Sequence, residues 1–186
     1  MRKLIVIDKL LENQIIKIHN ADVSIGIVAT GGGMQSISWL LSTPGASKTM
    51  LFVDVPYSKS ALHKLTGEKN SFLNIETAYN FAQNAYQRGS NLLDTPKENI
   101  LGIGWSSALT TNRIRKGKNI CYVAICTNTK EIGARLELKK DARTRWEEDF
   151  LVSQFIIMQI TQVLGLSFEI DLKLLPDEDV VDLYVR

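Results

Sequence analysis

A glycine-rich turn between a buried strand and a helix is the feature that most constrains the fold of this chain. Residues 23–28 are a short run rich in Val and Ile, which predicts a buried strand. The turn Thr-Gly-Gly-Gly at 30–33 interrupts this run, and residues 34–41 then have the apolar spacing of a helix. A strand that passes through a glycine turn into a helix begins an α/β fold.

The rest of the chain continues this alternation of strand and helix patterns. The expected helices span 8–20, 34–41, 58–65, 74–87 and 146–164, and the expected strands span 23–28, 50–55, 100–103, 120–126, 132–138, 168–174 and 180–185. We expect a polar loop over 104–117 and a hairpin between the fourth and fifth strands. Strands that alternate with helices predict a three-layer α/β/α sandwich around a mainly parallel sheet, which the hairpin makes a mixed one.

The charge of the chain is unevenly distributed. Residues 168–186 hold six acidic and two basic residues, a net charge of −4, and the whole chain carries +2, so the first 167 residues carry +6. A length of 186 residues with 45% hydrophobic content is typical of one globular domain. We therefore expect one domain over 1–166 and an acidic tail over 167–186, which forms either an extra strand or a linker.

Two clusters of basic residues are candidates for binding an anion. The first consists of Arg113, Arg115, Lys116 and Lys118, and the second of Lys139, Lys140, Arg143 and Arg145. Two interpretations are open: solvated ends of loops and helices, or a site for a group such as phosphate. The basic residues are not interleaved with aromatic ones and no recognition motif accompanies them, so we do not expect nucleic-acid binding.

Metal sites and membrane segments are not expected. The two cysteines, Cys121 and Cys126, and the two histidines, His19 and His63, are too few for a typical zinc site. We interpret the cysteines as packing residues and expect no metal and no cofactor. No apolar run reaches about 20 residues, and the first residues lack a signal-peptide pattern. The expectation is a cytoplasmic protein without a membrane partner.

Four short motifs follow one another along the first half of the chain. They are SIGIVATGGG at 24–33, PGAS at 44–47, VPYSKSALHKLTG at 55–67 and IETAYNFAQNA at 75–85. Their order resembles that of the CinA C-terminal domain family, which includes the nicotinamide mononucleotide amidohydrolases. The resemblance covers residues 8–166 and implies the family's fold.

The resemblance also implies a set of ligand-binding residues, because the family's motif positions line a pocket for a phosphorylated nicotinamide ribotide. Carried over to this chain, the matched positions are Thr30, Gly31, Gly32, Ser47, Tyr57 and Ser58. Either Arg143 or Arg145 corresponds to the family's arginine before the last helix. Trp105 replaces a small family residue, so it either lines the pocket, where it fills the space or stacks on a base or nicotinamide ring, or packs locally. The implied ligand is a phosphorylated nucleotide.

The chain departs from the family at the positions that carry the chemistry. The family's serine corresponds to Val28, which has no hydroxyl, and its lysine corresponds to Leu62. Amide hydrolysis needs an activated nucleophile and groups that stabilise the oxyanion. We therefore expect a divergent CinA-like domain without the standard deamidase activity, which acts as a binding or structural module.

A rebuilt active site is the alternative. Thr30 has a hydroxyl at the glycine turn, Tyr57 can exchange a proton, and Lys59 precedes Leu62 by about one helical turn. With these catalytic residues the chain would be an amidohydrolase of nicotinamide mononucleotide or a related nucleotide. Without catalysis, we expect Thr30 to be a helix N-cap, Lys59 a solvated surface residue and Tyr57 a half-buried aromatic.

The resemblance implies partners as well. Domains of this family commonly form homodimers and often stand next to another catalytic domain. The acidic tail lies beyond the resemblance, and it is a candidate connection to such a domain or to a protein partner.

Overall fold

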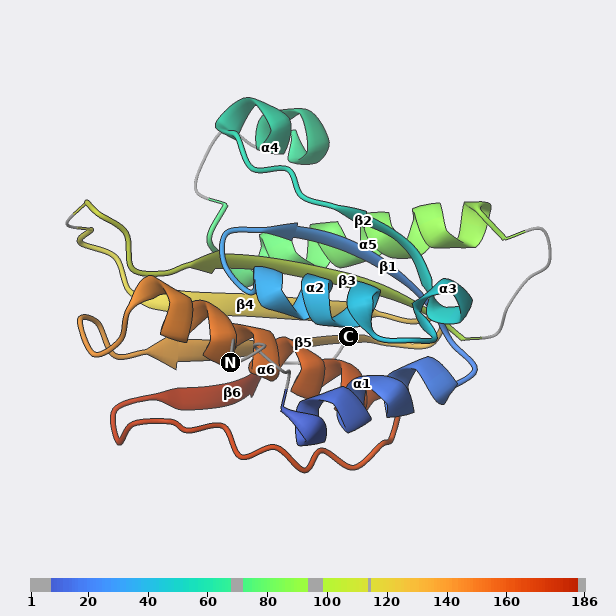
Figure 1. Cartoon of the computed structure of the whole chain (residues 1–186). Helices are drawn as coiled ribbons and strands as arrows, with labels where there is room; N and C mark the ends of the chain where they lie inside the picture. Colours follow the sequence, from blue (N-terminus) through green and yellow to red (C-terminus); the bar gives the residue numbers. More distant parts are fainter. Residues whose placement is uncertain (1–7, 68–71, 94–98, 114, 184–186) are drawn as a thin grey trace, which may run out of the picture.

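A six-stranded mixed sheet forms the centre of the molecule in the computed structural model (Figure 1). The structure describes residues 8–67, 72–93, 99–113 and 115–183. The strands are β1 (Ser24–Thr30), β2 (Met50–Asp54), β3 (Ile100–Ala108), β4 (Asn119–Cys126), β5 (Glu131–Leu138) and β6 (Asp179–Leu183). Their order across the sheet is β2-β1-β3-β4-β5-β6.

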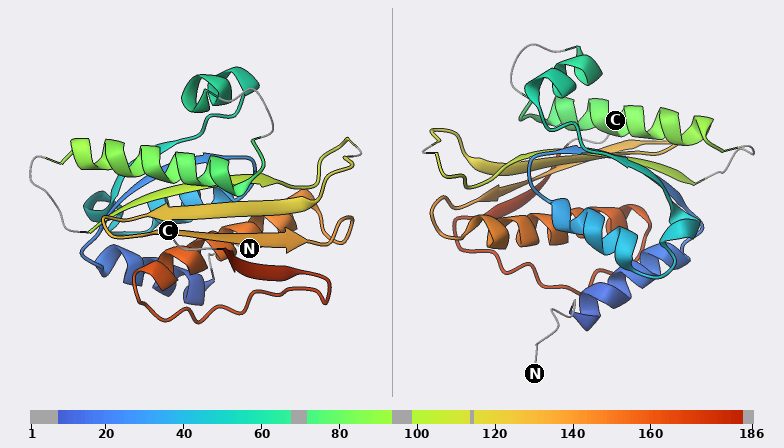
Figure 2. Two further views of the ribbon diagram at one scale, coloured as in Figure 1. Left: turned by 180° about the vertical axis from the view of Figure 1, so that it is seen from behind. Right: turned by 45° about the horizontal axis from the view of Figure 1, so that its top comes forward.

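Helices cover both faces of this sheet. They are α1 (Lys9–Asn20), α2 (Met34–Ser42), α3 (Ala46–Thr49), α4 (Lys59–Thr66), α5 (Ile75–Asn91) and α6 (Arg145–Val163). Helix α5 lies on one face, and α1, α2 and α6 lie on the other (Figures 1 and 2). The three-layer α/β/α sandwich is therefore confirmed, with its larger core between the sheet and the second group of helices.

The sheet is mixed, as expected, but it is not mainly parallel. β1 pairs in parallel with β2 and with β3, whereas β3, β4, β5 and β6 pair antiparallel in succession. Parallel strands that follow one another in the chain need a long crossover, usually through a helix. Helices α2 and α3 supply it between β1 and β2, and α4 and α5 supply it between β2 and β3. No helix of the described residues separates β3, β4 and β5, so these strands turn back on one another.

Strand β3 is longer than the sequence predicted, because the first part of the expected loop over 104–117 continues the strand to residue 108. Gly104, with which the expected loop began, serves packing instead, and so does Gly102 within the predicted strand. A Cβ atom at Gly102 or Gly104 would lie 2.2 to 2.3 Å from carbonyl oxygens of α5. These glycines let α5 lie directly on β3, while Trp105 is fully buried in the larger core on the other face.

The residues after α6 follow an extended path that we call the tail strap (166–178). Alternate residues of its first part pack against the larger core: Leu166, Phe168, Ile170, Leu172 and Leu174. This alternation is that of a strand, but no described strand pairs with residues 168–174, so the strand predicted there is wrong. The tail strap instead lies along α1 and α6 (Figure 1).

The last described element is β6, which adds an edge to the sheet next to β5. The strand was predicted over 180–185, and residues 184 and 185 lie outside the described residues. The division of the chain at residue 166 stays a prediction.

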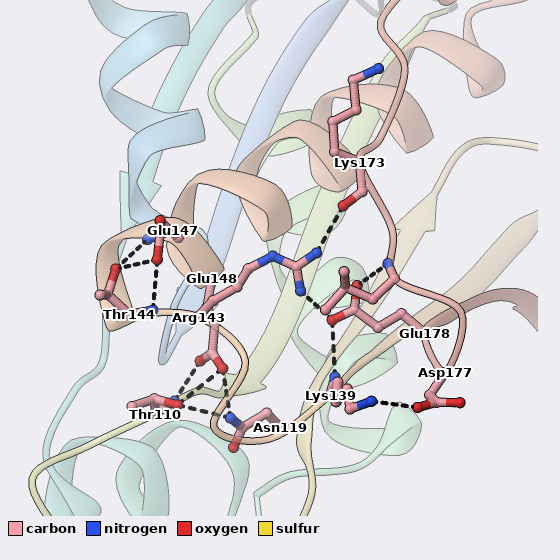
Figure 3. Close-up of polar contacts among 11 residues, drawn as sticks. Thr110, Asn119, Lys139, Arg143, Thr144, Glu147, Glu148, Lys173, Asp177 and Glu178 are labelled. Atoms are coloured by element: carbon pink, nitrogen blue, oxygen red, sulfur yellow. Dashed lines mark hydrogen bonds and ion pairs between the residues drawn. The ribbon is translucent and has the colours of Figure 1, made fainter.

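A buried carboxylate fixes the end of the tail strap (Figure 3). Glu178 accepts hydrogen bonds from the backbone amides of Lys139, at 3.0 Å, and Leu175, at 2.7 Å, and it pairs with the guanidinium of Arg143. Burial alone would raise the pKa of the Glu178 carboxyl. The three partners together lower this pKa by more than burial raises it, so it lies below its usual value. The strap is thereby joined both to β5 and to the segment before α6.

We expect Glu178→Ala to lower the free energy of unfolding by about 3–5 kcal/mol, because it leaves the largely buried guanidinium of Arg143 without its partner. Asp177→Ala is the matched control. It removes an exposed pair with Lys139 and should leave the urea midpoint nearly unchanged. Equal losses of stability in the two variants would contradict the role of Glu178.

The same carboxylate predicts a pH dependence. Folding lowers the pKa of Glu178, so its contribution is complete above the unfolded carboxyl value of about 4.3 and is lost as the pH falls through the lower folded value. Urea unfolding between about pH 5 and pH 3 should therefore show a steeper loss of stability in the wild type than in Glu178→Gln. Parallel pH profiles would contradict this expectation.

Candidate functional site

The backbone amides at the glycine turn between β1 and α2 are already bound by a carboxylate of the same chain. Gly33 is the N-cap of α2, with a φ of 84°, and it has no side chain to cap the helix. The carboxylate of Asp149, from α6, accepts hydrogen bonds from the backbone amides of Gly33 at 2.7 Å, Met34 at 3.3 Å and Gln35 at 3.2 Å. The donors that a phosphate would use at a helix N-terminus are therefore occupied by Asp149.

The other polar groups of the turn are also used within the fold. The indole nitrogen of Trp105 donates to the carbonyl oxygen of Gly32 at 2.8 Å, and the amide of Gly32 donates to the hydroxyl of Ser107. A Cβ atom at Gly31 would lie 1.8 Å from the carbonyl oxygen of Ser107. The glycines thus allow the turn to lie against β3, and the full burial of Trp105 agrees with its interpretation as a packing residue.

Thr30 ends β1 at the same turn. Its hydroxyl donates to the carbonyl oxygen of Pro56 at 2.9 Å, and its side chain is buried. This hydrogen bond ties the end of β1 to the segment that follows β2. Because Gly33 is the N-cap of α2, the expectation that Thr30 caps this helix is wrong.

The two positions at which the resemblance would place a serine and a lysine lie in one apolar cluster. Val28 and Leu62 are buried together with Phe81 and Ala85, and Phe52 is among the partly buried residues that pack against them. Val28 is completely inaccessible to solvent. The structure therefore brings these two positions together, with hydrocarbon in place of a hydroxyl and an amine.

The remaining residues implied by the resemblance are divided between the two ends of the sheet. Tyr57, Ser58 and Lys59 follow β2 and begin α4, where the Ser58 hydroxyl accepts a hydrogen bond from the amide of Ala61. Lys59 is exposed, and Tyr57 is 66% exposed rather than half-buried. Ser47 lies in α3, before the start of β2, which pairs with the start of β1. It is thus about 20 Å from the glycine turn, one strand length away.

A basic hollow lies at the end of the sheet where β1, β2 and β3 finish. We call it the arginine pocket: a hollow of about 820 Å³ lined by Tyr57, residues 110–113, Arg115 and Arg145. The carboxyl ends of parallel strands are the usual place for ligands in α/β folds. No acidic side chain lines this hollow among the described residues, and a neighbouring hollow adds Lys140 and Asp141.

A second layer of hydrogen bonds holds the wall of the arginine pocket (Figure 3). The carboxylate of Glu148, fully buried in α6, accepts from the amide and the hydroxyl of Thr110, at 2.6 and 3.0 Å, and from the side-chain amide of Asn119, at 2.7 Å. Thr110 in turn accepts from Arg145 through its carbonyl oxygen, and Asn119 accepts from Arg115. The guanidinium groups of Arg145 and Arg115 are therefore each held by a hydrogen bond to the pocket wall, and the pocket itself remains open.

Only one of the two candidate arginines before α6 lines this pocket. Arg145 does so, whereas Arg143 pairs with Glu178 and donates to the carbonyl oxygen of Lys173 at 2.8 Å. The basic cluster around residue 113 was noted from the sequence but was not among the predicted ligand-binding residues. The acidic residues 148 and 149 were missed, because a carboxylate in an amphipathic helix gives no sequence signal of the backbone amides that it meets.

The cysteines and histidines form no reactive or metal-binding group in the described part of the chain. Burial raises the pKa of the Cys121 thiol far above its usual value and that of Cys126 to about 11, so both stay protonated near neutral pH. Within residues 8–67, 72–93, 99–113 and 115–183, no group of three or more His, Cys, Asp or Glu side chains could hold a metal ion. None of the described helices is long and apolar enough to cross a bilayer.

We expect Asp149→Ala to lower the free energy of unfolding by about 2–3 kcal/mol, because three amides at the start of α2 lose a charged acceptor. Asp149→Asn keeps one acceptor oxygen and should lose about 1 kcal/mol. Sulfate should raise the melting temperature of Asp149→Ala by more than that of the wild type, since it can occupy the freed helix N-terminus. Wild-type stability in Asp149→Ala, measured by urea unfolding, would contradict this.

No protein-family model matches the sequence, and the curated proteins include no match. Solved structures match the fold. A CinA superfamily protein from Escherichia coli superposes with a TM-score of 0.64 at 15% identity, over 87% of this chain and 95% of that one.

Two further structures agree with this match. The competence/damage-inducible protein CihA from Agrobacterium tumefaciens has a TM-score of 0.65 at 11% identity, over 87% of this chain and 98% of that one. A CinA superfamily protein from Enterobacter cloacae has a TM-score of 0.60 at 12% identity, over 89% and 98%. Likeness at such low identity concerns the fold, and on that ground the chain has the fold of the CinA superfamily.

Proposed function

We propose that this chain is a CinA-fold binding module for a phosphorylated small molecule, held in the arginine pocket, and that it does not catalyse nicotinamide mononucleotide deamidation. The observation that supports the second part most strongly is the apolar cluster around Val28 and Leu62. Hydrolysis of an amide requires a nucleophile with a base beside it. At these two positions the chain places side chains that can neither attack a carbonyl nor carry a proton.

The alternative nucleophile and base are poorly arranged for the same reaction. Thr30 uses its hydroxyl proton in the hydrogen bond to Pro56. Lys59 is exposed to solvent at the start of α4, whereas the positions that carry the family's chemistry are buried. These contacts favour the binding module over an amidohydrolase with a rebuilt site.

The arginine pocket has the chemistry of a phosphate site. Arg113, Arg115 and Arg145 line it, and guanidinium groups suit the bidentate hydrogen bonds that phosphate oxygens accept. Tyr57 adds an exposed aromatic ring at the rim, on which a planar base or a pyridine ring can stack. A nucleotide with one phosphate would use both features.

The homodimer, the adjacent catalytic domain or protein partner, and the cytoplasmic location stay predictions from the sequence and the resemblance. None of them is needed for the arginine pocket, whose lining comes from one chain.

We expect no release of ammonia when the chain is incubated at micromolar concentration with nicotinamide mononucleotide. An authentic nicotinamide mononucleotide deamidase serves as the positive control in the same coupled assay. Turnover that disappears in Tyr57→Phe or Lys59→Ala would overturn the proposal and establish the rebuilt amidohydrolase instead.

We expect nicotinamide mononucleotide to raise the melting temperature of the chain, because a ligand that binds only the folded state stabilises it. Nicotinamide riboside, which lacks the phosphate, should have little effect. Arg113→Gln and Arg145→Gln should each weaken binding about tenfold or more, the usual loss for a charged hydrogen bond. Lys48→Gln, an exposed cation in α3, is the control and should bind normally.

Calorimetric titration at low and high salt completes this test. Binding through exposed guanidinium groups weakens as salt screens them. Equal affinity for the phosphorylated and unphosphorylated compounds, or unchanged affinity in both arginine variants, would contradict the assignment of the pocket.

A further inference from the structure

A second hollow, with a lining different from that of the arginine pocket, lies between α1, α6 and the tail strap. We call it the tail groove. Its volume is about 760 Å³, and its apolar lining includes Leu10, Trp146, Phe150, Leu151 and Ile170. It shares no lining residue with the arginine pocket. The volume falls in the range of sites that hold a ligand or the anchoring side chains of a partner.

The lining of the tail groove exposes unusually large apolar side chains. Trp146 is 78% exposed, Phe150 follows it one turn later in α6 and is 40% exposed, and Leu10 of α1 is 51% exposed. Trp39 packs against Phe150 in a T-shaped arrangement, with ring centroids 5.4 Å apart, and so helps to hold that ring in place. A supported aromatic pair of this kind is typical of the residues that contribute most to protein interfaces.

The rim of the tail groove is acidic. Asp8, Glu147, Glu169 and Asp171 line it, against the two cations Arg143 and Lys173. Arg143 is committed to the buried Glu178, while Glu169 pairs with Lys17 and Asp171 with Lys173 at the surface. The carboxylates of Asp8 and Glu147 have no ion pair among the described residues. The groove therefore combines an apolar floor with a surplus of negative charge.

The groove depends on the tail strap. Glu169, Ile170, Asp171 and Lys173 form one wall, and all four lie after residue 166, where the resemblance to the CinA C-terminal domain family ends. The groove therefore requires the tail strap as one of its walls.

The charge of the rim decides between two kinds of occupant. A two-fold contact between copies of this chain would place the same surface against itself, so the acidic rims would face one another. A basic partner would meet no such repulsion and would gain complementary pairs. We propose that the tail groove docks an amphipathic helical segment of another protein, with apolar residues toward Trp146 and Phe150 and lysines or arginines toward the acidic rim.

The test uses the full chain and a fluorescently labelled 16-residue peptide of leucine and lysine in helical spacing. We expect saturable binding by fluorescence anisotropy. A peptide of the same composition in scrambled order, and one with glutamate in place of lysine, should each bind at least about tenfold more weakly, because each lacks one half of the match. Equal binding of the three peptides would overturn the proposal.

Variants locate the binding on the molecule. Trp146→Ala and Phe150→Ala should each weaken binding about tenfold or more, as expected for central interface aromatics. Leu92→Ala, which removes an apolar side chain that is 60% exposed, after α5 on the opposite layer, should leave binding unchanged. Glu169→Gln with Asp171→Asn should weaken binding at low salt more than at high salt. Because Trp146 is mostly exposed, its variant should fold, and its melting temperature checks this.

Other occupants give distinct results. Sedimentation velocity that shows a wild-type dimer and a Trp146→Ala monomer would assign the groove to a second copy of the chain and overturn the proposal. Peptide binding that occurs only in a chain beginning at Asp8 would assign it to the chain's own first residues, with the same consequence. Binding that survives both aromatic substitutions would place the peptide elsewhere and also overturn it.

Discussion

The structure depends on one carboxylate, which caps the N-terminus of a helix although it belongs to a different helix. Asp149 collects three backbone amides of α2, and in doing so it joins the glycine turn to α6 across 114 to 116 positions of sequence. The glycines make this possible, since any side chain at Gly31 or Gly33 would collide with β3 or α6. A strand–turn–helix unit commonly leaves these amides for a ligand. Here they stabilise the fold, and the available cations lie farther out, in the arginine pocket.

The first five residues of α6 place four side chains in three different surroundings. Successive helical residues point about 100° apart. Arg145 therefore faces the arginine pocket and Trp146 faces the tail groove, while Glu148 holds the wall of the pocket and Asp149 holds the glycine turn. A capping box between Thr144 and Glu147 fixes where this helix begins. Both proposed binding surfaces consequently share the start of one helix.

Local patterns predicted most elements of the fold, and long-range contacts explain what they could not predict. The periodicity located five of the six described helices to within four residues and missed the short α3, and the order of elements predicted the three layers. The stretch that begins at Gly104 suggested a loop, because the sequence does not show that α5 needs the missing side chain there. The resemblance implied that the glycine turn lines a ligand pocket, but the carboxylate that its amides hold, Asp149, comes from a helix 116 residues later. The residues implied by the resemblance do not all lie together. Ser47 precedes β2 and Tyr57 follows it, so the two residues lie at opposite ends of that strand.

The tail strap separates two properties that usually go together in a folded chain. Its alternate side chains are packed, yet the backbone amides of residues 167–173 have no hydrogen-bond acceptor among the described residues. In a β-strand the ladder would protect these amides from solvent. Here only side-chain burial opposes exchange with water, so deuterium should enter this segment quickly while the fold remains closed. The tail strap thus forms the acidic wall of the tail groove without adding a strand to the sheet. Its outward-facing residues can be substituted one at a time without breaking a ladder of backbone hydrogen bonds.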